Sequence, residues 1–568
     1  MSFKTMRKAH YLPLVFWMVI LFASCMNTNN TNKNVNPTPA PPENQILRVP
    51  LGNDFDSLDP ALAQSGSGNP YNLIFSGLVT LQDDGTVAKQ LAASYQVSSD
   101  GLTYTFTLKS GLRFSDGTLL DANDVAYSLN RVLLPTTKSS VSGYLNLLKD
   151  SNKVMNGEIP TLIGDSIIVK SSSVISLVIS KPAAYFLEAL TYSTGDVVEK
   201  KLIDKYGTDW TNHLNEGGGS GPFKVLSYSH TTGLVLVPNS NYTEFRPKIQ
   251  KIIYVITGGD QDSTYRAFQA GQYDLAGVPP SLISTAKTQP GYQEVPALAS
   301  SFIEMNYLVK PLDNIHVRQA LDLAINKSLI IGRIIGPVVT PSNHLVPNGI
   351  PGYNPKLTGP DGVVGTTGDQ VRAVQLFQQG LKEEGYTNVN QLPALTLEYA
   401  NGVQFEADII TTIVSEWKEV LGITIKTTGV QGNQLVQDEV STTGHTGPLQ
   451  LWDGYWGADY PDPQDWLSNF FAKGGQDNFA NYGQNNSSAA TEQQAVQAEL
   501  AKADADQNQT ERLGLYQDAE QKIVNDVGWI TTYQTAYVAS INPKLQRFKL
   551  NSLGTSATSD WANIYFAQ

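Results

Sequence analysis

Strand patterns and helix patterns alternate along this chain from Ile46 onward, and no segment repeats at a fixed period. Residues 103–108 alternate apolar and polar side chains, which is typical of a half-buried strand. Asp121 precedes apolar residues at helical spacing and is a typical N-cap residue. Elements interspersed in this way pack as helices against sheets. The sequence therefore predicts an α/β or α+β protein.

Further elements can be bounded from their end signals. Asn314 is expected to cap a helix that carries Val317, Leu321, Ala324 and Ile325 on one face. Amphipathic helices are expected over residues 369–384 and 406–421, and the second should end at Gly422. The other expected strands lie at residues 46–50, 166–170, 174–180 and 423–427, the second and third forming a hairpin.

Length and charge narrow the class of protein. At about 150 residues per domain, 568 residues suggest about three to four domains. The chain has 39 Lys and Arg against 52 Asp and Glu, which gives a net charge of −13. An acidic chain is poorly suited to binding phosphate backbones, so nucleic acid is not an expected partner.

The N-terminus has the composition of an export signal. Basic residues precede an apolar stretch over residues 11–22, which is too short for a comfortable membrane span. Phe22-Ala23-Ser24-Cys25 then places small residues before the chain's single cysteine, and this resembles the lipobox of bacterial lipoproteins. We therefore expect a lipoprotein signal peptide over residues 1–25, with lipidation at Cys25. The alternative is an ordinary signal peptide with a chance cysteine.

The next segment, residues 26–44, is rich in asparagine, threonine and proline and offers little to bury. We expect a disordered tether there, followed by a folded body from Gln45. No later stretch approaches about 18 uninterrupted apolar residues, so the mature protein is expected to be anchored by lipid and not to span the membrane.

Patterns that would indicate a cofactor are weak. The six histidines are scattered, and none shows the i, i+4 spacing of a helical zinc pair. The glycine-rich residues 217–221 lack the Lys-Ser/Thr ending of a phosphate loop. Asp54, Asp56 and Asp59 do not match a calcium loop, because Leu58 stands where an oxygen ligand is needed. We expect no metal and no cofactor.

One segment, residues 452–466, combines carboxylates with aromatic side chains. Its acids are Asp453, Asp459, Asp462 and Asp465, and its aromatic residues are Trp452, Tyr455, Trp456, Tyr460 and Trp466. Three interpretations are open from these residues alone. They could form a glycosidase-like carboxylate pair, a cleft for an organic cation, or a turn whose acids are solvated.

Motifs spread along the chain resemble those of the family 5 extracellular solute-binding proteins, the oligopeptide- and dipeptide-binding components of ABC importers. The opening motif reads SLDP at residues 57–60, and the last reads YWGADYPDP at residues 455–463. The motifs between them stand in family order at residues 74–78, 91–95, 100–106, 114–117, 122–128, 221–223, 271–274 and 317–327. One departure is Asp526-Val527-Gly528-Trp529, which replaces a turn that usually contains proline.

The resemblance implies an α/β, two-lobed periplasmic binding protein fold of type II with an additional inserted domain. The implied lobe one is discontinuous, over residues 45–80, 196–305 and 533–568. The small inserted domain would span residues 81–195, and lobe two residues 306–532. Crossovers near residues 304–308 and 532–536 would act as hinges while the lobes close around a ligand.

The resemblance also implies the function and the site. The chain would bind a peptide, expected to be an oligopeptide, and deliver it to the permease subunits of an ABC transporter. By match to the family motif, Asp459 would bind the ligand's ammonium, Trp456 would pack beside its first residues, and the backbone of Tyr455 and Gly457 would supply hydrogen bonds. Gln64 and Gly66 would face them from lobe one.

The protein itself is expected to catalyse nothing and to act as a monomer, anchored outside the cytoplasm at the cell surface or in the periplasm. No arginine near Asp453 can be assigned to a peptide's C-terminal carboxylate, which leaves longer peptides and other solutes open. The alternatives are the same fold binding an oligosaccharide, nickel or haem and, more remotely, a secreted glycan hydrolase using two of the acids of residues 452–466.

Overall fold

The computed structural model describes residues 37–64, 70–554 and 556–568. The predicted signal peptide, Cys25, most of the predicted tether and Gly66 lie outside the described residues. The last residues assigned to the tether contact the C-terminal segment: Pro39 pairs with Ala567, and the Ala40 N–H donates to the Phe566 carbonyl over 2.7 Å. A short 3-10 helix, η1 (Pro42–Asn44), leads into the first strand.

The first sheet contains four strands in the order β1 (Ile46–Leu51), β10 (Lys251–Ile256), β9 (Gly233–Pro238) and β8 (Phe223–Ser229). β1 runs parallel to β10, and the other pairs are antiparallel. Its buried residues share a core with Trp210 and Trp561. The elements around it are α1 (Tyr71–Ile74), α5 (Lys200–Tyr206), η4 (Gly207–His213), η7 (Thr558–Ala562) and the two-stranded pair β18 (Leu545–Gln546)–β19 (Tyr565–Phe566). The other two-stranded pair, β2 (Val79–Leu81)–β3 (Val87–Lys89), packs on the core of the second sheet.

The second sheet is antiparallel throughout, in the order β4 (Ala92–Val97), β5 (Thr103–Leu108), β7 (Val174–Val178) and β6 (Ile167–Ser171). It shares one core with α2 (Ala122–Leu133). Asp121 caps α2, because its side chain accepts the Asn123 N–H while Asp124 accepts the Asp121 N–H. The predicted strand, hairpin and N-cap of this region are thereby confirmed. Its short elements are η2 (Ser142–Leu145), α3 (Ser151–Met155), α4 (Phe186–Ala189) and η3 (Ser193–Gly195).

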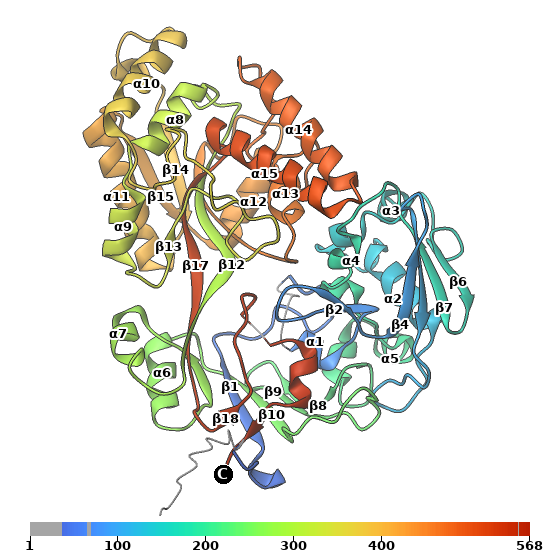
Figure 1. Ribbon diagram of the computed structural model, residues 1–568. Helices are drawn as coiled ribbons and strands as arrows, with labels where there is room; N and C mark the ends of the chain where they lie inside the picture. The colour runs from blue at the N-terminus through green and yellow to red at the C-terminus, as the bar shows by residue number, and fades with distance from the viewer. Residues whose placement is uncertain (1–36, 65–69, 555) are drawn as a thin grey trace, which may run out of the picture. The chain divides into compact units, whose positions relative to one another are not determined.

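The third sheet has the order β11 (Leu275–Gly277), β17 (Ile530–Ile541), β12 (Tyr292–Met305), β16 (Leu451–Gly457), β14 (Leu395–Ala400) and β15 (Ile425–Val430), with β13 (Thr340–Pro341) paired to β17. β12 and β17 are long antiparallel strands that lie side by side (Figure 1). Their register shifts between Pro296 and Ser300. Beyond that shift, β12 also pairs with β16.

Both faces of this sheet are covered by helices. Successive strand residues point to opposite faces, so Ile303 and Leu451 join one core while Phe302 and Trp452 join another. The first core includes residues of α8 (Ile315–Leu323), α9 (Lys327–Ile334), α10 (Gln370–Glu383) and α11 (Gln404–Leu421). The second includes residues of α12 (Gly432–Thr442), α13 (Gln464–Phe471), α14 (Ala490–Ala505) and α15 (Gln509–Asp526). The remaining short elements are α6 (Gln261–Gln269), η5 (Pro280–Leu282), α7 (Ile283–Ala286) and η6 (Val389–Gln391).

The predicted helices of this region are confirmed, with one difference at a helix end. The helix capped by Asn314 ends at Leu323, because Asn326 caps α9 through the Leu329 N–H and begins a separate helix. α11 ends at Leu421, and Gly422 after it adopts a φ of +74° as expected for a glycine cap. The following strand begins at Ile425, two residues later than predicted, where parallel pairing with Leu395 of β14 starts.

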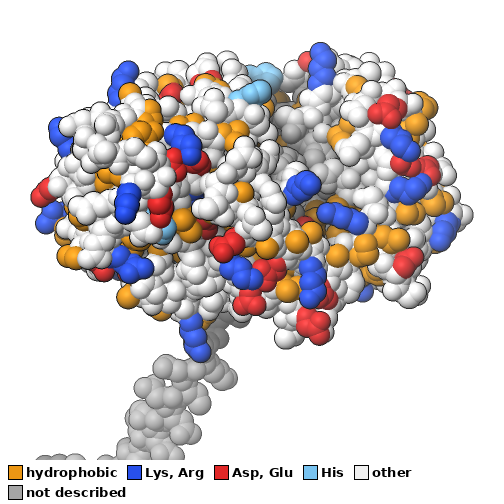
Figure 2. All heavy atoms as spheres, turned by 90° about the horizontal axis from the view of Figure 1, so that it is seen from above, with side chains coloured by type: hydrophobic (Ala, Val, Ile, Leu, Met, Phe, Trp, Pro, Cys, Tyr) orange, Lys and Arg blue, Asp and Glu red, His pale blue; other side chains and the backbone are white. Residues whose placement is uncertain are grey.

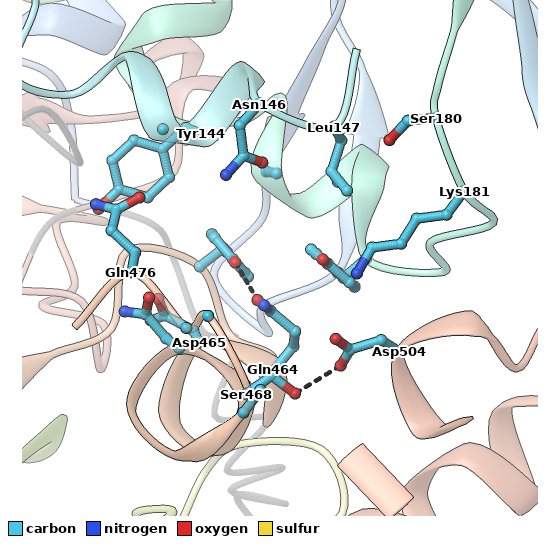
Figure 3. A pocket seen from close by; sticks show the side chains of 18 of the residues that line it. Tyr144, Asn146, Leu147, Ser180, Lys181, Gln464, Asp465, Ser468, Gln476 and Asp504 are labelled. Carbon is cyan, nitrogen blue, oxygen red and sulfur yellow. Dashed lines mark hydrogen bonds between the residues drawn. The ribbon is translucent and has the colours of Figure 1, made fainter. Parts of the chain in front are cut away.

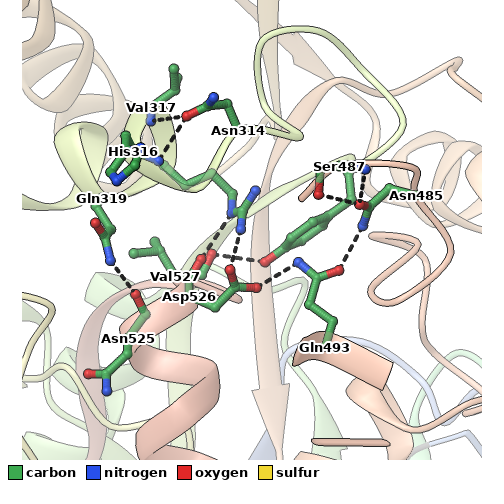
Figure 4. A network of polar contacts seen from close by, with 12 residues as sticks. Asn314, His316, Val317, Gln319, Asn485, Ser487, Gln493, Asn525, Asp526 and Val527 are labelled. Atoms are coloured by element: carbon green, nitrogen blue, oxygen red, sulfur yellow. Dashed lines mark hydrogen bonds and ion pairs between the residues drawn. The ribbon is translucent and has the colours of Figure 1, made fainter. Parts of the chain in front are cut away.

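A buried ion pair ties α8 to the end of α15 (Figure 4). The Arg318 side chain is fully buried and donates to the Asp526 carboxylate over 2.5 Å. It also donates to the carbonyls of Asp526 and Leu312 over 3.0 and 2.9 Å. Gln493 of α14 donates to the other Asp526 oxygen over 2.8 Å. Three helices therefore share one fully satisfied polar cluster.

This cluster holds the turn that departs from the family pattern. Val527 has a φ of +54°, a left-handed conformation that is unusual for a β-branched residue. Its carbonyl accepts a hydrogen bond from the Tyr307 hydroxyl over 3.1 Å, and its side chain is buried. The contacts of Tyr307 and Arg318 with the two residues of the turn fix this backbone without a proline.

Arg318→Met should destabilise the protein strongly, because it leaves Asp526 buried without its cation. We expect a loss of roughly 3–5 kcal/mol in the free energy of unfolding. The control is Lys522→Met, which breaks a pair between Glu499 and an exposed lysine and should cost at most about 1 kcal/mol. Urea unfolding followed by tryptophan fluorescence measures both, and equal losses would contradict the role given to Arg318.

Candidate functional site

The acidic and aromatic segment identified in the sequence forms β16 and the turn after it. Along its whole length β16 pairs with β12. On its other side only Leu451 and Trp452 pair, with Leu397 and Glu398 of β14. Among the described residues, no strand pairs with this second edge from Asp453 to Gly457. Backbone groups of β16 are therefore available at this edge for an added strand.

The two faces of β16 differ in character. Trp456 points into the core, where its ring meets Phe470 edge-on at 5.0 Å. Gly454 lies on the same face, and a Cβ there would come within 2.2 Å of the Phe302 ring, so the position requires glycine. Tyr455 points the other way and is 60% exposed. A large aromatic surface thus stands free beside the open strand edge.

Asp459 lies just beyond the end of β16 and is half-buried. Its carboxylate accepts a short hydrogen bond from the hydroxyl of Tyr144, which belongs to η2. Its backbone N–H donates to the carboxylate of Asp465 over 2.9 Å. Burial raises the pKa of Asp459 to about 7, with a further contribution from Asp477, while the Tyr144 bond acts in the opposite direction.

Further acids surround Asp459. Burial and the charge of Asp459 raise the pKa of Asp465 well above its usual range. Burial also raises the pKa of Asp477 to about 6 and, together with Asp477, that of Glu439 to about 7. The charged groups that shift these four pKa values are themselves acids. This end of the strand therefore carries negative potential that a cation would relieve.

The other acids of the segment have different surroundings. Asp462 forms a buried two-bond ion pair with Arg512, at 2.7 and 2.5 Å, and this contact ties the turn to α15. Asp453 lies half-buried on β16, and burial and the charge of Glu406 raise its pKa. The four acids thus do not form one set: Asp459 and Asp465 lie together, whereas Asp462 is already paired.

Gln64 is connected to Asp459 by contacts of Tyr192 and Tyr144. Its carbonyl accepts a hydrogen bond from the Tyr192 hydroxyl over 2.8 Å, and the Tyr192 ring stacks on Tyr144 with centroids 4.0 Å apart. The backbone N–H of Gln64 donates to Asp56 over 2.6 Å. Sequence reasoning missed Tyr144 and Tyr192, because nothing in their local pattern separates them from other tyrosines.

The opening motif has a structural partner. Asp59 accepts two hydrogen bonds from the Arg131 guanidinium of α2, one at 2.8 Å and one shorter. The Trp210 indole donates to the same carboxylate over 3.0 Å. This buried ion pair connects two parts of the chain: the loop that leads to Gln64, and α2, which packs on the second sheet.

The described residues contain no group of three or more His, Cys, Asp or Glu side chains arranged to hold a metal ion. They also include no helix that is both long enough and apolar enough to cross a membrane.

The raised pKa of Asp459 predicts that the stability of the folded chain depends on pH. A carboxyl whose pKa is about 7 in the folded chain and about 4 when unfolded binds more protons in the folded state between these values, so the free energy of unfolding falls as pH rises through that window. Asp459→Asn should reduce this fall by on the order of 1 kcal/mol or more. Urea unfolding at pH 5 and pH 8 measures it, and an identical pH dependence in both proteins would refute the raised pKa.

Comparison with known proteins gives the chain its family. Residues 86–478 match the family described as bacterial extracellular solute-binding proteins, family 5 middle. The chain is 26% identical over 441 residues to the oligopeptide-binding protein OppA of Bacillus subtilis, covering 76% of this chain and 78% of that protein. It is 25% identical over 498 residues to the dipeptide-binding protein DppE of B. subtilis, covering 86% of each.

A solved structure confirms the fold. The periplasmic oligopeptide-binding protein OppAIV from Borrelia burgdorferi superposes with a TM-score of 0.73 at 24% identity, over 92% of this chain and 99% of that one. The two-lobed α/β binding-protein fold predicted from the sequence is therefore the fold of this chain. With the family match over residues 86–478, the chain belongs to family 5 of the bacterial extracellular solute-binding proteins.

Proposed function

We propose that this chain is the extracytoplasmic substrate-binding component of an ABC importer, which captures a peptide between two lobes and delivers it to membrane permease subunits. The observation that carries the proposal is the open edge of β16, which ends beside the carboxyl of Asp459. Membership of the solute-binding family and the peptide-binding relatives support it.

An open strand edge suits a peptide better than other solutes. An extended peptide added to Asp453–Gly457 would form main-chain hydrogen bonds that do not depend on its side chains. The backbone of Tyr455 and Gly457 would supply these bonds, and the exposed Tyr455 ring would cover part of the ligand. Trp456 would contribute mainly by fixing the strand, because its ring is packed against Phe470.

The ammonium of the peptide's first residue would then pair with Asp459. Burial and the neighbouring acids disfavour the charged carboxylate, as the raised pKa of Asp459 indicates. An ammonium brought to this position would favour the ionised form and would compete with the Tyr144 hydroxyl for the carboxylate. In this proposal the Tyr144 contact holds Asp459 in position until a ligand arrives.

We propose that closure of the two lobes brings Gln64 and Gly66 to the ligand. We retain lobe one as residues 45–80, 196–305 and 533–568, the inserted domain as 81–195, and lobe two as 306–532. Closure would swing lobe two about the crossovers expected near residues 304–308 and 532–536, which lie in and beside β12 and β17. Gln64 and Gly66 would then face the ligand from the opposite side.

The alternatives have less support. A hydrolase has less support than a binding protein, because the family match and the peptide-binding relatives favour binding and Asp462 is already paired with Arg512. Nickel or haem binding would gain from converging histidines, and the sequence scatters them. An oligosaccharide could stack on Tyr455, but it would not use a row of main-chain groups. We therefore propose a binding protein that acts without catalysis.

Acetylating a peptide's amine should weaken its binding to the unaltered protein, because the ammonium that pairs with Asp459 is lost. Asp459→Asn should weaken binding of the free peptide by roughly 30-fold or more, corresponding to roughly 2–5 kcal/mol for an unpaired buried charge. In that variant, acetylation should matter much less. Calorimetry on the four combinations measures the coupling between the two changes.

A matched control is Asp453→Asn, which removes a half-buried carboxyl from β16, the strand that precedes Asp459, and should leave the effect of acetylation intact. If acetylated and free peptides bind the unaltered protein equally well, Asp459 is not the partner of the ammonium.

We also propose that the Cys25 thiol is lipidated and that residues 1–24 are removed, so that Cys25 becomes the new N-terminus and anchors the protein outside the cytoplasm. Cys25→Ala should abolish acylation and either release the protein or leave an uncleaved precursor. Detergent partitioning and intact mass measure this. A mature-size variant that still partitions into detergent would contradict the anchor.

A further inference from the structure

A cavity of about 270 Å³ has Tyr144 and Asp465 in its wall (Figure 3). Its walls come from two parts of the chain: residues 143–152 and 180–189 on one side, and residues 460–476 with Asp504 on the other. Tyr144 and Asp465 both line it, and both hydrogen-bond to Asp459. These two residues therefore connect the cavity to the proposed ammonium partner.

Asp465 presents an unused oxygen to this cavity. The residue is only 1% exposed. One carboxylate oxygen, Oδ2, accepts the Asp459 N–H over 2.9 Å and the Trp456 indole N–H over 3.4 Å. The other oxygen, Oδ1, has no hydrogen-bond partner among the described residues, although the side chain lines the cavity. This oxygen therefore faces the cavity and can accept a hydrogen bond from a donor that enters it.

Charge balance points to the kind of donor. Asp459 and Asp465 place two carboxyls at one end of the cavity, and a single ligand ammonium can compensate only one of them. Burial raises the pKa of Asp504, while Lys181, which lies near it, and Arg512 act to lower it. Lys473 also lines the cavity, at an exposed position. Burial and Asp459 raise the pKa of Asp465 and no cation acts on it, so a ligand cation would favour its ionised form.

The size of the cavity indicates how much of a ligand it takes. Small-molecule sites usually enclose about 300–1,000 Å³, so a cavity of about 270 Å³ suits one side chain and not a whole peptide. Leu147 and the Tyr144 ring can cover a hydrocarbon stem, while Asn146 and Gln476 offer amide groups near its polar end.

We infer that this cavity receives a basic side chain, lysine or arginine, from the first residue of the bound peptide, and that its cation pairs with Oδ1 of Asp465. This inference rests on the proposed function and makes it more specific: the preferred ligands are peptides with a cationic N-terminal residue. Asp459 binds the α-ammonium and Asp465 the side-chain cation, so each carboxyl has its own partner.

Calorimetry with three pentapeptides of the form X-Ala-Ala-Ala-Ala tests the inference, where X is lysine, norleucine or glutamate. Norleucine matches the lysine stem but carries no charge. In the unaltered protein, the lysine peptide should bind at least about tenfold more tightly than the norleucine peptide, and the glutamate peptide most weakly. The same exchange of lysine for norleucine at the third position should have little effect.

Asp465→Asn should reduce the preference for lysine over norleucine to nearly one, because the amide oxygen can still accept the Asp459 N–H but carries no charge. The control is Asp408→Asn, which removes an exposed acid of α11 outside the cavity and should leave the preference unchanged. Circular dichroism establishes that each variant is folded, and the comparison of peptides in the unaltered protein is decisive by itself if a variant does not fold.

Equal binding of the lysine and norleucine peptides, tighter binding of the glutamate peptide, or an unchanged preference in folded Asp465→Asn would each overturn this inference. Failure of every peptide to bind would overturn the proposed function as well. Binding without a preference at the first position would overturn this inference alone.

Discussion

The antiparallel pairing of β12 with β17 is the constraint on which the rest of the structure depends. The chain enters residues 306–529 through β12 and leaves them through β17. The register of this strand pair therefore fixes where residues 306–529 begin and end in the third sheet. β16 pairs with the far half of β12 along its whole length. The position of the open strand edge, and of Asp459 beyond it, therefore follows from these two strands.

The electrostatics of the site fit a protein that is completed by its ligand. Two other buried acids have a cation as partner: Asp526 pairs with Arg318, and Asp462 pairs with Arg512. Around Asp459, burial raises carboxyl pKa values and the neighbouring charges are acids. The free energy lost by burying these groups can be regained when a cation arrives, which links affinity to charge.

Much of the fold could be predicted from local patterns. Apolar periodicity and cap residues placed α2, α10 and α11 and the strand pair β6–β7, because those signals act over a few residues. The start of β15 was wrong by two residues, since parallel pairing with β14 decides it.

The site divides in the same way. The motif around Asp459 could be recognised in the sequence, and Asp465 could be named as one of its acids. The Tyr144 contact could not be predicted, because it joins residues 315 positions apart. The pairing of Asp462 with Arg512, 50 positions apart, depends equally on tertiary packing and removes one acid from the candidate set. Only the structure shows that Asp462 is paired with a cation whereas Asp465 lies beside Asp459.

Amide hydrogen exchange in β16 tests the central claim most directly. A ligand that adds a strand to the open edge must protect backbone N–H groups between Asp453 and Gly457. At a peptide concentration shown by calorimetry to be saturating, we expect exchange in this segment to slow markedly, while the sheet of β4, β5, β7 and β6 keeps its rates. Unchanged exchange across Asp453–Gly457 at saturation would contradict binding at this edge.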